Sequence, residues 1–480
     1  MKRTPLSLIA HWAGAELHGD DVSIEAIGND TRTLAPGSLY VALRGEHFDG
    51  HAFADAALAA GASALLVQQP LPLDVPQVVA ADTQLALARI AAAMQRDRAV
   101  QVFAITGSNG KTSVKNLLLA ILQHVAALDG RRVHATPGNR NNEIGLPLAV
   151  IDAPEDADWA IYEMGTGKPG DIAYLTAIAA PDVGLVNNVA PAHLERMGSL
   201  LGIADTKAAV YDDLRPGGVA VINADDAFAP YFNARAAGHR VIRFGLEASA
   251  ELTAVDIAPV EAGSRFVLRT PQGEATVTLQ LPGRHNVLNA LAAASMALAA
   301  GITLARVAEG LAQARPVAGR QAAHQLDGGV VLIDDSYNAN PGSLAAAIAA
   351  LAVSGQPGWL VLGDMRELGP DARALHAQAG RRARQAGLQR LYTLGPLSEA
   401  AARAFGEGAR HFESHAALAA ALIADLPATS AAPPPPGNDH SPFSIPRSPR
   451  VLVKGSRGSA MDKIVTALLQ QRGEDPSHVA

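Results

Sequence analysis

The stretch TGSNGKT, Thr106 to Thr112, decides the fold of this chain. It follows an apolar run, Val102 to Ile105, and precedes a stretch, 117–125, in which apolar residues recur at spacings of three and four. This order predicts a strand, a glycine-rich loop and a helix. Gly107 and Gly110 allow a tight turn whose amide groups, together with the positive end of the helix dipole, face one anion. The stretch therefore predicts a phosphate-binding loop.

The side chains of this loop suit a nucleoside triphosphate with magnesium. Lys111 would reach the terminal phosphates, and the Thr112 hydroxyl would hold a magnesium ion that bridges them. Ser108 and Asn109 complete the predicted loop. The standard pattern places a glycine where this chain has Ile105. A glycine-rich turn that only closes a strand is the alternative, but Gly-Lys-Thr after a predicted strand favours nucleotide binding.

Length and composition limit the class of protein. A chain of 480 residues predicts about three domains, at roughly 150 residues per domain. A net charge of -7 without any Lys/Arg block argues against nucleic acid as a partner. The absence of cysteine excludes disulfides, thiolate metal sites and a cysteine nucleophile. No apolar run approaches about 18 residues, so we expect a cytoplasmic protein without membrane insertion.

The predicted fold class is α/β, with three domains. Residues 1–97 form a small α/β domain, and residues 98–314 alternate strands with helices, which predicts a mostly parallel sheet. Residues 315–480 resemble a dinucleotide-binding α/β domain without the GxGxxG fingerprint. The Ala/Pro/Ser-rich segment 427–450 is aperiodic and is predicted to be a mobile surface insertion. The strands predicted in the central domain are 102–105, 159–164, 183–189 and 219–223.

Polar side chains follow the predicted strands of the central domain, where ligands of open α/β sheets gather. Glu163 ends the run WAIYE and could hold a metal ion, although a solvated carboxylate explains it equally well. His193 would project into the same cleft, although a single loop histidine is more often a surface residue. In the polar segment 136–147, the amides of Asn141 and Asn142 could bind a substrate or satisfy the backbone of a long loop.

The chain carries nine characteristic blocks in order: TGSNGKT, PGNRNNEIG, YEMG, NNVAPAHLE with Lys207 downstream, GRHNVLNALAA, PVAGR, DDSYNANPGS, LGDMRELG and VLVKGSRG. Together they resemble the Mur ligases of peptidoglycan precursor synthesis. DDSYNANP and KGSR are typical of the branch that joins D-alanyl-D-alanine to a UDP-N-acetylmuramoyl-tripeptide. The resemblance runs from a loop near residue 30 to the final helix, except for 427–450, and it implies an ATP-dependent ligase that we expect to be a monomer.

The resemblance also implies a mechanism. ATP would convert the tripeptide carboxylate into an acyl phosphate, which the dipeptide amine then attacks. Lys111 and Thr112 would hold the ATP phosphates and one magnesium ion, while Glu163 and His193 would hold a second. Arg320 would reach the γ-phosphate from the third domain, so that domain closure completes the site. The residues implied in catalysis are Lys111, Lys207, His193 and Arg320.

The other ligand contacts are implied in the same way. Adenine would lie against Asn286, and the ribose hydroxyls against Asp335. The first domain would hold the uridine end of the substrate, although the residues alone indicate ordinary turn chemistry for its polar loops. The residues implied in contacts with the tripeptide or the dipeptide are Asp30, Thr31, Arg32, Asn141, Asn142, Asn338, Lys454, Ser456 and Arg457.

Lys207 is implied to act in a modified form. A protonated lysine cannot coordinate magnesium, but the equivalent lysine of the family is carbamylated by carbon dioxide and becomes an anionic ligand. The spacing between His193 and Lys207 matches the family, whereas Ala208 and Ala209 stand where the family often carries glycine and glutamate. The residues alone indicate an ordinary helical surface lysine in IADTKAAVYDDL.

Two other functions stay open from the sequence. A folylpolyglutamate-type ligase would share the phosphate loop and the modified lysine but would not need a uridine-binding first domain. A regulatory ATP-binding protein would keep TGSNGKT but would have no reason to keep two metal ligands, Arg320 and KGSR. The third residue of the stem peptide, diaminopimelate or lysine, does not follow from the sequence.

Overall fold

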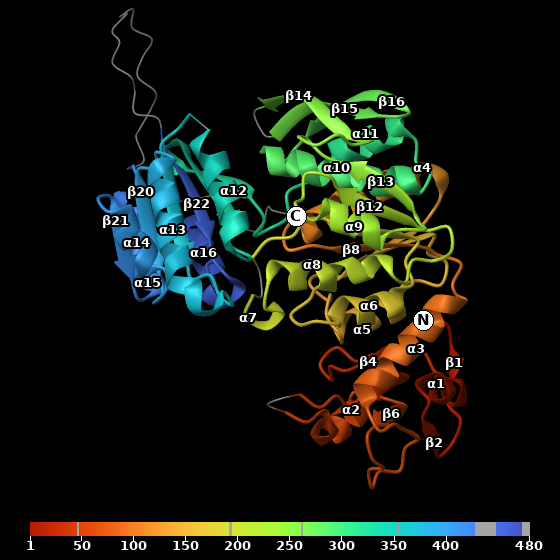
Figure 1. Cartoon of the computed structure of the whole chain (residues 1–480). Helices are drawn as coiled ribbons and strands as arrows, with labels where there is room; N and C mark the ends of the chain where they lie inside the picture. Colours follow the sequence, from red (N-terminus) through yellow and green to blue (C-terminus); the bar gives the residue numbers. More distant parts are fainter. Residues whose placement is uncertain (46–47, 192–193, 261–262, 354, 428–447, 473–480) are drawn as a thin grey trace, which may run out of the picture.

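The computed structural model describes residues 1–45, 48–191, 194–260, 263–353, 355–427 and 448–472. Three α/β parts are present: the first part (residues 4–97), the central part (101–313) and the third part (317–472), which begins with a short bridge between Val317 and Arg320. The first part lies below the central part in Figure 1, and the third part lies beside it. The helices of the described residues include none that is long and apolar enough to cross a bilayer.

The first part has a five-stranded sheet in the order β2-β7-β6-β5-β4, in which only β2 is antiparallel to its neighbour. A short antiparallel pair, β1 and β3, lies outside this sheet. Its elements are β1 (Thr4–Pro5), α1 (Leu6–Ala13), β2 (Glu16–His18), β3 (Ser23–Ile24), β4 (Ala26–Gly28), β5 (Ser38–Val41), η1 (Gly50–Phe53), α2 (Ala54–Ala59), β6 (Ala64–Val67), β7 (Gln77–Val79) and α3 (Thr83–Asp97).

Helix α3 joins the first part to the central part. It packs on α5 (Gly145–Ile151) and α6 (Asp171–Ala179) of the central part, and its apolar side chains belong to the same hydrophobic core as theirs. Arg98, directly after α3, is buried, donates to the carbonyls of Val150 and Ile151 and pairs with Glu155 at 3.0 Å. The boundary predicted at 97/98 therefore lies at a packed interface. That boundary and the one at 314/315 stay predictions.

The central part is built on a six-stranded parallel sheet in the order β13-β12-β11-β8-β10-β9. This confirms the mostly parallel sheet predicted from the alternating pattern. Its elements are β8 (Gln101–Thr106), α4 (Lys111–Asp129), β9 (Val133–Ala135), α5 (Gly145–Ile151), β10 (Trp159–Glu163), α6 (Asp171–Ala179), β11 (Val183–Val186), α7 (Leu194–Met197), α8 (Leu200–Ala208), η2 (Ala209–Tyr211), β12 (Val219–Asn223), α9 (Ala229–Arg235) and β13 (Arg240–Phe244).

The central strand β8 shows how this sheet is buried on both faces. Val102 and Ala104 belong to the core that α3, α5 and α6 cover, whereas Phe103 and Ile105 belong to the core under α4, α10 and α11. Successive side chains of a strand point to opposite faces, so a continuous apolar run fits a strand between two helical layers. The same burial keeps the phosphate loop at the end of a rigid strand.

A small antiparallel sheet, β14-β15-β16, extends the central part. The predicted hairpin corresponds to β15 and β16, but the exposed strand β14 was not predicted. The elements of this region are β14 (Thr253–Val260), β15 (Gly263–Thr270), β16 (Gly273–Leu279), α10 (Arg284–Ala299) and α11 (Leu304–Gln313).

The third part has a six-stranded sheet in the order β17-β18-β22-β19-β20-β21, parallel except for β17. Its elements are β17 (Ala322–Leu326), η3 (Asp327–Gly329), β18 (Val330–Asp335), α12 (Pro341–Ala352), β19 (Gly358–Gly363), η4 (Gly369–Asp371), α13 (Ala372–Gln385), β20 (Arg390–Leu394), α14 (Glu399–Phe405), β21 (Ala409–Phe412), α15 (His415–Asp425), β22 (Arg450–Lys454), η5 (Arg457–Ser459) and α16 (Asp462–Arg472).

The predicted insertion 427–450 precedes β22, the strand that pairs with both β18 and β19. Residues 428–447 lie outside the described residues. The end of the predicted segment belongs to the sheet, because Arg450 begins β22 and the carbonyl of Pro449 accepts the amide of Val331 at 3.2 Å. The surface position of the rest of the segment stays a prediction.

Candidate active site

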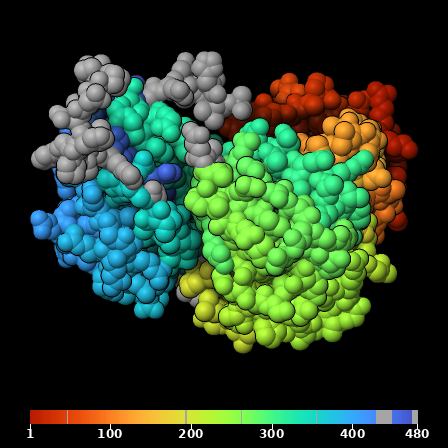
Figure 2. Space-filling model, turned by 90° about the horizontal axis from the view of Figure 1, so that it is seen from above, coloured from red at the N-terminus to blue at the C-terminus, as the bar shows by residue number. Residues whose placement is uncertain are grey.

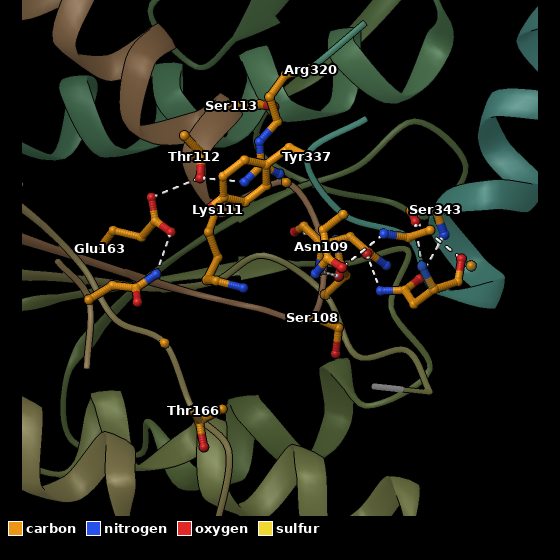
Figure 3. A pocket seen from close by; sticks show the side chains of 18 of the residues that line it. Ser108, Asn109, Lys111, Thr112, Ser113, Glu163, Thr166, Arg320, Tyr337 and Ser343 are labelled. Atoms are coloured by element: carbon orange, nitrogen blue, oxygen red, sulfur yellow. Dashed lines mark hydrogen bonds between the residues drawn. The ribbon is translucent and has the colours of Figure 1, made fainter. Parts of the chain in front are cut away.

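A cavity of about 700 Å³ lies between the central and third parts, which Figure 2 shows against each other from above. Its walls are formed by the loops after β8 and β10, the start of α10 and the loop between β18 and α12 (Figure 3). The predicted site residues that line it are Ser108, Asn109, Gly110, Lys111, Thr112, Asn141, Asn142, Glu163, Asn286, Arg320, Asp335, Asn338 and Lys454.

The phosphate loop is shaped by two asparagines that follow β11. The amide of Ser108 donates to the carbonyl of Asn188 at 2.9 Å, and the amide of Asn109 donates to the Asn188 side chain at 2.8 Å. Gly110 has φ +78, and a Cβ there would lie 2.6 Å from the side chain of Asn187. Glycine is therefore required at Gly110 for both conformation and space. Helix α4 begins directly after it, at Lys111.

Lys111 is held inside this loop. Its Nζ donates to the carbonyl of Gly107 at 2.8 Å. Burial lowers the pKa of the Lys111 amine, whereas the nearby Glu163 carboxylate raises it and Arg320 lowers it. A phosphate in the loop would compensate the charge of this amine and favour its protonated form.

Glu163 is a buried carboxylate of the cavity. Its Oε2 accepts from the Thr112 hydroxyl at 2.9 Å, and its Oε1 accepts from the Asn141 amide at 2.9 Å (Figure 3). The side chain is only 4% exposed, so the alternative of a solvated strand-end carboxylate is wrong. Lys115 Nζ lies 3.5 Å from Oε2 and also donates to the carbonyls of Thr136 and Gly138.

Arg320 reaches the phosphate loop from the third part. Its Nη2 donates to the Thr112 hydroxyl at 3.0 Å, and its guanidinium lies 4.2 Å from the centre of the Tyr337 ring. A second contact joins the same parts, because the Asn340 amide donates to Asn109 Oδ1 at 2.6 Å. Asn340 also caps the start of α12. Residues more than 200 positions apart thus meet at one loop.

The oxygen atoms beside the phosphate loop fit a magnesium ion. The Thr112 hydroxyl and the Glu163 carboxylate are hard oxygen donors of the kind magnesium prefers. Among the described residues, no group of three or more His, Cys, Asp and Glu side chains is placed to hold a metal, at this loop or elsewhere. His193, the other predicted histidine ligand, lies outside the described residues.

Lys207 lies on α8 and is only 3% exposed. The alternative of an ordinary surface lysine is therefore wrong. Burial lowers the pKa of the Lys207 amine well below its usual value, and the positive charge of Lys111 lowers it further. Only an unprotonated amine can react with carbon dioxide. The carbamate that forms is an anion, and the nearby positive charge would stabilise it.

The predicted ribose and dipeptide contacts lie together in the third part. Lys454 Nζ donates to Asp335 Oδ2 at 2.6 Å and to the carbonyl of Asn338 at 3.0 Å. Ser456 and Arg457 do not line the cavity. Ser456 accepts a backbone amide and donates to a backbone carbonyl, and the Arg457 guanidinium lies 5.5 Å from the centre of the Tyr337 ring.

Comparison with known proteins agrees with this arrangement. Family models described as Mur ligase middle domain, glutamate ligase domain and catalytic domain match residues 105–297, 319–430 and 23–101. The UDP-N-acetylmuramoyl-tripeptide–D-alanyl-D-alanine ligase of Escherichia coli (strain K12) is 40% identical over 474 residues, 98% of each chain. This chain belongs to the Mur ligase family.

Solved Mur ligases share the fold. MurF from Acinetobacter baumannii superposes with a TM-score of 0.88 at 30% identity, over 98% of this chain and 100% of that one. MurF from Thermotoga maritima in complex with ADP gives 0.80 at 26% identity, over 93% and 97% of the two chains. A folylpolyglutamate synthase from Mycobacterium tuberculosis, at 19% identity and a TM-score of 0.63, shares the fold alone. The predicted three-domain α/β class is confirmed.

The predicted contacts for the uridine end of the substrate lie apart from the cavity. Asp30, Thr31 and Arg32 belong to the first part and do not line the cavity. Arg32 donates to both oxygens of Asp30, and these hydrogen bonds lower the pKa of Asp30 to about 2.

Five residues of the site were not predicted from the sequence: Lys115, Asn187, Asn188, Tyr337 and Asn340. Of these, only Lys115, a charge on the apolar face of α4, carried a signal in its pattern.

Proposed function

We propose that this Mur ligase joins D-alanyl-D-alanine to a UDP-N-acetylmuramoyl-tripeptide and consumes ATP. The products would be the UDP-linked pentapeptide, ADP and phosphate. One observation carries the proposal: the Thr112 hydroxyl of the phosphate loop contacts both Glu163 of the central part and Arg320 of the third part. Relatives that match nearly the whole chain are named for this reaction, and one relative is named as a complex with ADP.

The first step would activate the tripeptide. Its terminal carboxylate oxygen forms a bond to the γ-phosphorus while the bond from that phosphorus to the β-phosphate oxygen breaks, which leaves an acyl phosphate and ADP. Negative charge on the transferring oxygens must be neutralised by fixed cations. Lys111 and the loop amides would orient the phosphates, and Arg320 would face the γ-phosphate from the third part.

The second step would form the peptide bond. The unprotonated amine of the dipeptide attacks the acyl carbon to form a C–N bond. The tetrahedral intermediate then breaks its bond to the phosphate oxygen, and the amine proton goes to the expelled phosphate or to solvent. Thr112, Glu163, His193 and carbamylated Lys207 are the residues proposed to hold two magnesium ions, which neutralise phosphate charge when bound. Asn141 and the Thr112 hydroxyl keep the Glu163 carboxylate oriented.

The other contacts remain part of the proposal. Adenine would lie against Asn286 and ribose against Asp335, with the dipeptide near Lys454 and the uridine end on the loop that carries Arg32. The cavity lies between two parts that are joined by the hydrogen bonds from Arg320 to Thr112 and from Asn340 to Asn109, which supports closure of the third part as a step in catalysis. A monomeric cytoplasmic enzyme agrees with this scheme.

The experiment is an assay of phosphate release with the UDP-linked tripeptide, with and without D-alanyl-D-alanine, and with mass analysis of the product. We expect steady release and the pentapeptide only when ATP and both substrates are present. A folate substrate with glutamate serves as the comparison for a folylpolyglutamate-type ligase. Turnover of folate in place of the tripeptide, or phosphate release that ignores both substrates, would contradict the proposal.

A further inference from the structure

Lys168 and Arg196 are two cations of the cavity that the proposed function does not use. Lys168 lies on the loop between β10 and α6, and Arg196 lies in α7, after β11. Both side chains line the cavity and are exposed. Strands β10 and β11 flank β8 on its two sides, so the segments that follow them lie on either side of the phosphate loop.

The Arg196 guanidinium lies close to the loop that carries Lys168. A Cβ placed on Gly167 would be 3.9 Å from Nη1 of Arg196, so the Arg196 guanidinium lies against the loop that carries Lys168. The conformation of that loop is held by Asp171, whose Oδ2 accepts the amides of Gly167 and Lys168 at 2.8 and 2.9 Å. The Lys168 side chain therefore extends from a defined turn beside a second positive charge.

Most other charges that line the cavity have partners. Asp335 pairs with Lys454 at 2.6 Å. Glu163 accepts from Thr112 and Asn141, and Asp171 accepts the two backbone amides described above. Glu163 and Asp335 therefore have cationic neighbours, Lys115 and Lys454. Asp171 accepts from neutral amides and keeps its negative charge.

Lys168 and Arg196 have no such balance. Within the described part of the chain, neither side chain forms an ion pair. The lining carries one more cation than carboxylates: the cations are Lys111, Lys168, Arg196, Arg320 and Lys454, and the carboxylates are Glu143, Glu163, Asp171 and Asp335. An adjacent guanidinium and ammonium suit a carboxylate, because both donate charge-assisted hydrogen bonds.

We propose that Lys168 and Arg196 bind the free carboxylate of the acidic residue inside the peptide stem of the UDP-linked substrate. This inference rests on the proposed function. A solved relative from Acinetobacter baumannii is named for a substrate with a glutamyl residue before its diaminopimelate. A glutamyl residue uses one of its two carboxyl groups in the peptide bond, so the other keeps its negative charge.

The position of the pair agrees with this assignment. The reacting carboxylate must meet the γ-phosphate at the phosphate loop. A carboxylate one residue earlier in the stem lies roughly 3.5 Å further per residue of extended chain, within the same cavity. Loops that flank the phosphate loop are therefore within its reach. The pair acts on binding of the stem and does not touch the transferring phosphate.

The test combines a change in the substrate with a change in the protein. The substrates are the UDP-linked tripeptide and the same compound with its glutamyl carboxylate converted to a carboxamide. The protein variants are Lys168→Gln with Arg196→Gln, and as control Arg265→Gln with Lys463→Gln, two exposed cations outside the cavity. Calorimetry on the full chain without ATP measures the Kd for each combination of protein and substrate.

We expect wild-type protein and the control variant to bind the carboxamide about tenfold more weakly than the carboxylate, since two exposed ion pairs together contribute about this factor. The Lys168/Arg196 double variant should bind both compounds alike, with the weaker affinity. In turnover, its KM should rise about tenfold and its kcat should stay within about twofold. A double variant that still discriminates tenfold overturns the proposal.

Two further comparisons test whether Lys168 and Arg196 bind a different anionic group of the substrate. UDP alone should bind wild type and the double variant equally, and an equal loss for UDP would assign the pair to the diphosphate instead. The affinity of the double variant for tripeptides that end in lysine and for tripeptides that end in diaminopimelate should fall by the same factor. A loss confined to diaminopimelate would move the contact to the third residue and overturn the assignment.

The outcome stays distinct from that of the proposed function, because calorimetry requires no reaction. Wild-type protein that distinguishes carboxylate from carboxamide but forms no pentapeptide would contradict the ligase activity and support the carboxylate site. Wild-type protein that forms pentapeptide equally well from both compounds would contradict the site and support the activity.

Discussion

Replacement of Lys207 by alanine tests the proposal that a modified lysine acts as a metal ligand. Lys207 is 3% exposed on α8, and burial lowers the pKa of its amine well below the usual value. Lys111 lowers it further, so a protonated Lys207 is disfavoured, whereas a carbamate anion would be favoured by the same neighbour. Lys207→Ala would remove this anion from the metal site.

The expected loss is large. Removal of one preorganised electrostatic group lowers turnover by about 10² to 10³, or about 2.7–4 kcal/mol of transition-state stabilisation. Truncation of a buried stem also destabilises a fold, by roughly 2–5 kcal/mol for an aliphatic side chain. Lys207→Met is therefore the matched control, because it fills the site without an amine. We expect the same loss of turnover in both variants, with the larger fall in Tm in Lys207→Ala.

The assay is phosphate release with both substrates, with ATP affinity measured separately by calorimetry. ATP should still bind, because Lys111 and Thr112 are intact. Formate or acetate should restore part of the rate in Lys207→Ala but not in Lys207→Met, whose side chain fills the space. Wild-type enzyme stripped of carbon dioxide at low pH should recover when bicarbonate is added. Full activity in both variants, or a wild-type rate that ignores carbon dioxide, would refute the carbamate.

Other predictions concern charge placement and the long segment before β22. Lys111→Ala should lower kcat by about 10² to 10³, and a wild-type rate in steady-state assays would contradict the phosphate-loop assignment. Arg320→Ala should slow turnover while calorimetry shows unchanged tripeptide binding. Arg320→Lys should recover little of the turnover, because lysine lacks the planar fork of the guanidinium. An equal loss of tripeptide binding would count against a role in the closed state. Replacement of 429–446 by a short Gly/Ser bridge should leave kcat and KM nearly unchanged, since loop length changes closure entropy only slowly, and an inactive folded deletion would assign the segment to the site. Without carbon dioxide, the free energy of unfolding should rise with pH between the lowered folded pKa of Lys207 and about 10.4, because the unfolded state binds more protons in that window. Denaturant titrations of wild type and Lys207→Met measure the difference. Identical pH slopes of the two unfolding free energies would contradict the lowered pKa.

Local sequence was sufficient where function depends on neighbouring residues. The strand, glycine loop and helix around Thr106–Thr112 could be predicted because their signals are contiguous: an apolar run, two glycines and a 3.6-residue period. Gly110 is required by its own positive φ, which a short motif can record. The hairpin of β15 and β16 was found for the same reason, since its strands and turn follow one another along the chain.

Tertiary structure decided what depends on distant residues. Lys207 has the local pattern of a surface lysine, and only the packing of α8 makes it buried and lowers its pKa. Asp335 and Lys454 are 119 positions apart and were assigned to different ligands, yet β18 and β22 pair and place their charges 2.6 Å apart. Arg320 meets Thr112 only because two domains face each other. Periodicity reports the burial of a residue within its own element, whereas the partners of a buried charge are set by how the elements pack.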